Sequence, residues 1–295
     1  MEVVGRPKYG TSNFNHFVSG DGKQFFLKLY SSKKIDIVNK IDLLFKYLST
    51  SERDFPELIK PINNRLGSRY STYKDFLIFL YPMVNGKNIA ILNGKQLCEV
   101  ARALNSFHML KEIIYDKHLE GYFAHKSVEL NEKDILYLNS KFGVNYTGFF
   151  STLKFLTENK LKPASNSLLH GDTDFTNYLF KNDKLIALVD IDECYIGDLK
   201  EEVIKSVLSL TLGRNDNNFE RNKAELFIKQ FRKMDYDSNI VDYYSYRHIY
   251  SSLKHFSEKN KLSPSSVNIS IIKYFLRLFD IYRKNRKEVY SAFQS

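Results

Sequence analysis

The residues best equipped for chemistry lie in one short stretch, His170-Gly171-Asp172-Thr173-Asp174-Phe175-Thr176-Asn177, and in Asp190, which ends the apolar run that follows it. A carboxylate such as Asp172 can accept the proton of an attacking hydroxyl group. The amide oxygen of Asn177 and the carboxylate of Asp190 are hard oxygen ligands of the kind that Mg²⁺ prefers. Together, these groups are what the transfer of a phosphoryl group from a nucleotide requires.

The spacing of these residues strengthens that interpretation. Asp172 and Asn177 are separated by the same interval as the aspartate and asparagine of the protein-kinase catalytic loop. Asp190 lies where the metal-binding aspartate of a kinase would follow. His170 fits a residue that supports the loop by hydrogen bonds better than one that takes part in chemistry.

The elements that must position these residues begin with β structure. Alternating apolar residues on either side of a turn predict a hairpin. The segment 33–48 has the apolar spacing of an amphipathic helix, and a further apolar strand is expected after it. The two hairpin strands are expected at 14–18 and 25–30, and the later strand at 76–81. Lys28 lies on the second hairpin strand, and Phe26 and Tyr30 share its face. If that face is buried, the ammonium needs an anionic partner, and nucleotide phosphates would suit it.

The rest of the chain is predicted to be mainly helical. A connector at 82–86 separates the two parts, so we expect an N-lobe at residues 1–84 and a C-lobe at 85–295. Within the C-lobe, two short strands, expected at 178–180 and 185–190, flank a turn at Asn182-Asp183. Helices follow with breaks near 213–216, 235–237 and 263–264. The segment 112–165 is expected to hold two or three helices. The predicted fold class is α+β.

Composition excludes several kinds of protein. The longest apolar run, Phe76 to Val84, contains Pro82 and is too short for a membrane span, which takes about 20 residues. The N-terminus lacks the apolar segment of a secretory signal, and two cysteines provide neither a disulfide framework nor a zinc pattern. We therefore expect a cytoplasmic protein that does not interact with membranes.

The net charge is +10. Such a charge suits nucleic acid or another anionic ligand, but it also fits the Lys- and Asn-rich composition that an AT-rich genome encodes. We therefore do not expect a nucleic acid partner.

The ordered motifs resemble the aminoglycoside phosphotransferase and choline kinase superfamily. The strongest of these motifs is H-G-D-x-x-x-x-N at residues 170–177, followed by Asp190. Weaker matches are a nucleotide loop at Tyr9–Val18, a proline link at Phe55–Pro61, a hinge at Leu80–Gly86, a helix end at Ala103–His108 and the segment Ile191–Asp198 after the metal aspartate. The resemblance covers most of the chain. It implies a bilobal protein-kinase-like fold, with a small antiparallel sheet in the N-lobe and a larger, mainly helical C-lobe.

The resemblance also implies a function and a set of site residues. The expected reaction is transfer of the γ-phosphate of ATP, or alternatively GTP, to a hydroxyl of a small molecule with Mg²⁺ as cofactor. Asp172 would be the catalytic base, and Asn177 and Asp190 the metal ligands. The nucleotide would be bound by Lys28, by Ser12 and Asn13 of the loop, and by the backbone of hinge residues Tyr81 and Met83. Asp174 and Asp192 are candidates for contact with the substrate.

Two features depart from the kinase pattern. The lysine of kinases pairs with a helix glutamate, but the approximate register places Asn39 there, with Asp36 and Asp42 nearby. Asp174 stands where a Ser/Thr protein kinase often has a positive charge, and it would repel a phosphate unless it is turned away or paired. The partner of Lys28 therefore stays open.

Two other functions stay open as well. A protein kinase of this fold would need an exposed activation segment, and the stretch from Asp190 to Lys200 is short for one. A non-catalytic pseudokinase could use the basic run Arg283–Lys287 on nucleic acid, although cations near a helix C-terminus also complement the helix dipole. The phosphate acceptor and the oligomeric state do not follow from the sequence.

Overall fold

The structure is a computed structural model that describes residues 1–7, 14–49, 55, 57–116, 167–212 and 218–295, together with residues 123, 133, 136 and 140. Ser12 and Asn13 of the expected nucleotide loop lie outside the described residues. So does most of the segment 112–165, for which helices are predicted, and so does the expected break at 213–216.

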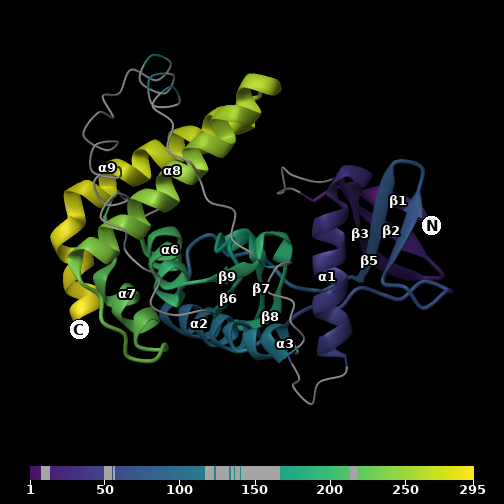
Figure 1. The fold of residues 1–295 in the computed structure, drawn as a ribbon, viewed down its shortest axis with the longest axis horizontal. Helices are drawn as coiled ribbons and strands as arrows, with labels where there is room; N and C mark the ends of the chain where they lie inside the picture. The colour runs from purple at the N-terminus through teal and green to yellow at the C-terminus, as the bar shows by residue number, and fades with distance from the viewer. Residues whose placement is uncertain are drawn as a thin grey trace. The chain divides into compact units, whose positions relative to one another are not determined.

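The N-terminal region is a five-stranded antiparallel sheet with the order β1-β2-β3-β5-β4. Four of its strands, β1, β2, β3 and β5, are labelled in Figure 1. The strands are β1 (Glu2–Gly5), β2 (Phe14–Gly20), β3 (Lys23–Ser31), β4 (Tyr70–Tyr73) and β5 (Phe76–Pro82). The expected hairpin and the later strand are confirmed as β2, β3 and β5. Asp21 and Gly22 turn the hairpin with positive φ angles of 50° and 72°, as a two-residue hairpin turn requires.

Helix α1 (Ile35–Leu48) follows the hairpin and contacts β3. Val38, Ile41, Phe45 and Leu48 are buried along one face, which is the 3.6-residue period that predicts this helix. On β3, Lys28 and Tyr30 are buried as well. The face that carries Lys28 therefore points into the protein.

The segment with the signature residues folds into short elements. Strand β6 (Ser167–Leu169) pairs with β9 (Tyr195–Gly197), and β7 (Tyr178–Lys181) forms a hairpin with β8 (Lys184–Leu188). The 3₁₀ turns η3 (Phe175–Asn177) and η4 (Ile191–Glu193) complete it. Asn182 and Asp183 form the β7–β8 turn with φ angles of 50° and 62°, as predicted from the sequence.

The expectation that the last strand reaches Asp190 is wrong. Strand β8 ends at Leu188, and Asp190 has left-handed backbone angles (φ 64°, ψ 57°) immediately before η4. A residue in this conformation cannot continue a strand. Asp190 and Asp192 are therefore related by a tight turn and not by the alternation of an extended chain.

The remaining described elements are helices. They are α2 (Gly94–His108), α3 (Lys111–Asp116), α6 (Leu199–Thr211), α7 (Arg221–Ile228), α8 (Ser238–Leu262) and α9 (Ser266–Gln294). Asp237 caps α8 and Ser265 caps α9 by accepting hydrogen bonds from backbone N–H groups of the first turn. The predicted breaks near 235–237 and 263–264 are confirmed at these caps.

The chain divides into two compact units. One comprises residues 1–90, 102–124 and 167–196, and the other comprises residues 91–101, 125–166 and 197–295. The antiparallel N-terminal sheet and the mainly helical C-terminal region confirm the α+β, bilobal kinase-like fold class. The exact lobe boundary after residue 84 stays a prediction. Among the described helices, none is both long and apolar enough to cross a membrane.

A buried carboxylate joins α8 and α9, the two longest of the described helices, which run side by side (Figure 1). Asp242 of α8 is 2% exposed. It accepts hydrogen bonds from Tyr282 Oη (2.6 Å) and Arg286 Nε (3.0 Å), and Arg286 Nη2 also contacts it. These bonds satisfy a charge that would otherwise be buried at a high cost.

We predict that Asp242→Asn lowers the free energy of unfolding by about 1–3 kcal/mol, because it removes the charge that pairs with Arg286 and weakens the bond from the Tyr282 hydroxyl. The measurement is denaturant unfolding followed by circular dichroism. Glu258→Gln, at an exposed position of the same helix, is the matched control and should change the value by less than about 0.5 kcal/mol. Equal stabilities of the two variants would contradict a structural role for Asp242.

Candidate active site

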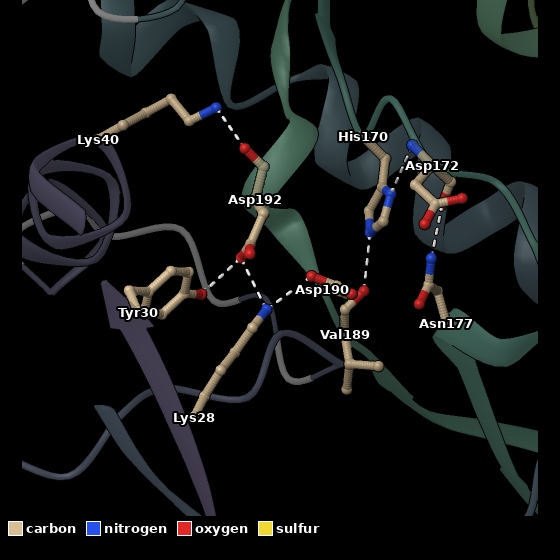
Figure 2. Close-up of polar contacts among 9 residues, drawn as sticks. All are labelled: Lys28, Tyr30, Lys40, His170, Asp172, Asn177, Val189, Asp190 and Asp192. Carbon is tan, nitrogen blue, oxygen red and sulfur yellow. Dashed lines mark hydrogen bonds and ion pairs between the residues drawn. The ribbon is translucent and has the colours of Figure 1, made fainter. Parts of the chain in front are cut away.

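The signature loop is held by His170, whose side chain is completely buried. Its Nε2 lies 3.0 Å from the carbonyl oxygen of Val189, and the Asp172 amide donates to Nδ1 over 3.4 Å (Figure 2). Both bonds form when the ring proton is on Nε2. The ring also packs against Phe107, with centroids 5.7 Å apart. His170 thus links the loop to the backbone just before Asp190, as expected for a supporting residue.

Gly171 is required by the close approach of two backbone segments. Its φ angle is +84°, and a Cβ atom at this position would lie 2.4 Å from the carbonyl oxygen of Glu193. No side chain fits in this space. The glycine therefore allows the loop before Asp172 to lie directly against η4.

Asp172 lies in a concentration of negative charge. Burial of the carboxyl group and the negative charges of Asp190 and Asp174 together raise its pKa to about 6. Asn177 Nδ2 donates to the Asp172 carbonyl oxygen over 3.0 Å. The structure thus brings three predicted residues together: a carboxylate whose pKa is near neutrality, a second carboxylate, and an asparagine amide.

The side chain of Asp174 caps the short turn η3. Its Oδ1 accepts hydrogen bonds from the backbone N–H and from Oγ1 of Thr176, both at 3.0 Å. The carboxylate that departs from the kinase pattern is thus paired locally. Contact between Asp174 and a substrate stays a prediction.

Lys28 lies between two carboxylates (Figure 2). Its Nζ donates to Asp190 Oδ1 at 2.6 Å and to Asp192 Oδ1 at 2.8 Å. The Lys28 residue is only 5% exposed, and burial alone would lower its pKa, but the charges of Asp192 and Asp190 raise the pKa well above its usual value. Lys28 is therefore charged. Its partners are Asp192 of η4 and Asp190, the residue just before η4.

The same contact acts on Asp190. Loss of water would raise the pKa of this carboxyl, but the Lys28 ammonium outweighs that effect and lowers it. Asp190 is therefore ionised near neutral pH, as a metal ligand must be. Its left-handed backbone is a strained conformation that often marks functional sites in proteins.

Helix α1 contributes a cation to this site. Lys40 Nζ donates to the carbonyl oxygens of Asp192 (2.6 Å) and Cys194 (2.8 Å). Asn39, which the register placed opposite Lys28, is not among the partners of Lys28, and Asp42 pairs with Arg69 at 3.5 Å. The contribution of Lys40 escaped the sequence analysis because a lysine on a half-buried helix face looks like a solvent-exposed residue.

Asn88 is a second residue that the sequence analysis missed. Its Nδ2 donates to the carbonyl oxygens of Thr176 (2.7 Å) and Tyr178 (3.1 Å), on either side of Asn177. The neighbouring Lys87 exchanges two backbone hydrogen bonds of 2.9 Å with Phe180. The segment after β5 is thus attached directly to the loop that carries Asn177. The position of Asn88, two residues after the proposed hinge ends at Gly86, is the only signal in the sequence.

The hinge residues lie at the end of β5. Tyr81 is packed near Phe26 and Phe79, and its burial raises its pKa, an effect to which the charges of Asp192 and Asp190 add. The Met83 amide donates to the Gln24 carbonyl over 3.3 Å, so an adenine ring that uses this amide must replace or share a long bond. Nucleotide contacts at Tyr81 and Met83, like those at Ser12 and Asn13, stay predictions.

The donor atoms of the site suit Mg²⁺ better than a softer metal. The described residues contain no group of three or more His, Cys, Asp or Glu that could hold a metal ion. A site built from Asn177 and Asp190 would instead use one amide oxygen and one carboxylate, which leaves room for water and phosphate oxygens around a hard cation. The negative charge that raises the pKa of Asp172 is a further reason for a cation to bind there.

A scan against protein-family models found no match, and a search of curated proteins found none either. Solved structures do match. A spectinomycin phosphotransferase in complex with ADP and spectinomycin has a TM-score of 0.64 and 18% identity, over 97% of this chain and 91% of that chain. An amicoumacin kinase in complex with AMP-PNP and Ca²⁺ has a TM-score of 0.56 and 15% identity, over 96% and 90%.

A third similar structure is an aminoglycoside phosphotransferase from Alicyclobacillus acidocaldarius, with a TM-score of 0.59 and 11% identity over 100% of this chain and 92% of that one. The chain has the fold of the aminoglycoside phosphotransferases. The resemblance inferred from the motifs is thus confirmed at the level of the fold, over nearly the whole chain.

We predict that Gly171→Ala lowers the free energy of unfolding by about 2–5 kcal/mol, because the new methyl group adds a steric clash to an unfavourable φ. Gly22→Ala is the matched control. Gly22 also has a positive φ, but a Cβ there would meet no atom within 4 Å, so the cost should be only about 1 kcal/mol. Thermal and denaturant unfolding of both variants give the comparison, and equal losses would show that the contact with Glu193 is unimportant.

Proposed function

We propose that this protein is a kinase that transfers the γ-phosphate of ATP to a hydroxyl group of a small molecule, with Mg²⁺ as cofactor. The observation that carries the proposal is the gathering of Asp172, Asn177, Asp190 and Lys28 at one place. A base, two metal ligands and a phosphate-binding cation are the parts that phosphoryl transfer uses. The fold shared with phosphotransferases, two of them solved with nucleotides, supports it.

In this mechanism, Asp172 accepts a hydrogen bond from the acceptor hydroxyl and orients its oxygen for in-line attack on the γ-phosphorus. As the new O–P bond forms, the bond between the γ-phosphorus and the bridging oxygen breaks, ADP leaves, and the hydroxyl proton passes to Asp172. A pKa of about 6 lets Asp172 be ionised at neutral pH and still accept this proton.

The other residues position the nucleotide. Asn177 and Asp190 would hold Mg²⁺, which supplies positive charge to the phosphate oxygens when it is bound. Lys28 would direct its ammonium to the α- and β-phosphates. Catalysis of this kind depends mostly on positioning and on charge stabilisation, so the supports of the loop matter as much as the groups that react.

The acceptor that we propose is a small molecule with a free hydroxyl group. The similar structures include enzymes named for spectinomycin, amicoumacin and macrolides. Aminoglycosides, choline, homoserine, nucleosides and sugars complete a sensible panel, because each carries a free hydroxyl. The first experiment therefore measures ADP release from ATP and Mg²⁺ across this panel.

We expect one class of acceptor to stimulate ADP release, and we expect Asp172→Asn to reduce kcat by about 10²–10⁴-fold, as the loss of a general base does. Asp183→Asn is the matched control, because Asp183 lies in the β7–β8 turn and asparagine tolerates its positive φ. It should keep full activity. ATP binding with transfer only to a protein substrate would instead indicate a protein kinase, and absence of ATP binding would indicate a pseudokinase.

The pH dependence of kcat/KM gives a second prediction. Because Asp172 must be deprotonated to accept the proton, kcat/KM should fall below an apparent pKa of about 6. Asp174→Asn keeps an acceptor for the Thr176 cap but removes a negative charge that raises the pKa of Asp172. It should therefore move the acidic limb to lower pH, and a limb that stays in place would contradict the assignment of Asp172 as the base.

A further inference from the structure

The two carboxylates that bind Lys28 have different surroundings. The Asp190 side chain is 41% exposed and the Asp192 side chain only 10%. The same Oδ1 atom of Asp192 that binds Lys28 also accepts a hydrogen bond of 2.7 Å from Tyr30 Oη. Asp190 therefore faces a place that a ligand can reach, whereas Asp192 is enclosed by residues of the protein itself.

Strand β3 and helix α1 both hold Asp192. Tyr30 lies two residues after Lys28 on β3, and the Lys28 ammonium lies 5.3 Å from the centre of its ring. Lys40 of α1 holds the Asp192 backbone through its carbonyl oxygen, and holds the end of η4 through Cys194. Asp192 is thus held at its side chain by β3 and at its backbone by α1, which is what a fixed anchor requires.

Charge balance separates the roles of the two carboxylates. Under the proposed function, the Asp190 carboxylate would bind Mg²⁺, and the Lys28 ammonium would bind the phosphates of the nucleotide. Lys28 is buried, and a buried ammonium that lost both carboxylates would depend on the nucleotide alone for its partner. Asp192 can remain bound to Lys28 in both states because its contacts do not involve the open part of the site.

We propose that Asp192 is the positioning residue of Lys28, and that Asp190 is the partner that Lys28 gives up when a Mg²⁺-nucleotide binds. This inference rests on the proposed function and deepens it. Asp192 then performs the task that a helix glutamate performs in protein kinases, while α1 holds η4 through Lys40. Asp192 acts through Lys28 and does not touch the reacting atoms.

The test is the affinity for AMP-PNP, measured by calorimetry with either EDTA or Mg²⁺ present, in the wild type and two matched variants. Asp192→Asn should weaken binding about tenfold in both conditions, because Lys28 loses its anchor whether or not metal is present. Asp190→Asn should weaken binding only with Mg²⁺, and should bind no more weakly than the wild type in EDTA. Circular dichroism confirms that each variant is folded.

Tyr30→Phe provides a milder variant in case Asp192→Asn does not fold. It removes one hydrogen bond to the anchor and should weaken AMP-PNP binding about two- to fivefold in both conditions. Wild-type affinity in folded Asp192→Asn and Tyr30→Phe would overturn the inference while the proposed function stands. An effect of Asp192→Asn only with Mg²⁺ would also overturn it, because Asp192 would then be a metal ligand. A wild type that binds no AMP-PNP in either condition would overturn both.

Discussion

The candidate site depends on the need to stabilise one buried charge. Lys28 points inward from β3, and an ammonium that is 5% exposed must have anionic partners close by. Asp190 and Asp192 meet this requirement at 2.6 and 2.8 Å. Because they come from the segment after β8, the lysine fixes the N-terminal sheet to the residues that follow the signature loop. A buried ion pair of this kind adds little to stability by itself, but the loss of one partner is costly because it leaves the other charge buried and unpaired.

Backbone carbonyl groups carry much of the remaining organisation. His170 binds the Val189 carbonyl, Asn88 binds those of Thr176 and Tyr178, and Lys40 binds those of Asp192 and Cys194. These acceptors lie in the 3₁₀ turns η3 and η4 or at or next to the ends of β7, β8 and η4, and a buried backbone carbonyl group needs a hydrogen-bond partner. The proposed catalytic and metal-binding residues are thus placed by neighbours that have no proposed role in the reaction. A small change at such a neighbour would displace Asp172, Asn177 or Asp190 without altering any of them.

The sequence predicted most of the elements, because local patterns control them. The hairpin with its Asp21-Gly22 turn, the apolar stripe of α1 and the turn at Asn182-Asp183 depend on residues close in the chain. The spacing of Asp172 and Asn177 is equally local. The prediction failed at Asp190, where an apolar run seemed to continue a strand. There the chain instead takes a left-handed turn, and no pattern of apolar residues signals that conformation.

The sequence by itself thus determined which residues are candidates for phosphoryl transfer, since the carboxylates, the asparagine and the lysine stand in a recognisable order. Only the tertiary structure decided how they combine. Lys28 and Asp192 are separated by 164 positions in the chain, so no local pattern relates them. The structure pairs them, raises the pKa of Asp172 by burying it and by placing Asp190 near it, and brings Lys40 to η4. Distances and burial control these effects, and both exist only once the chain has folded.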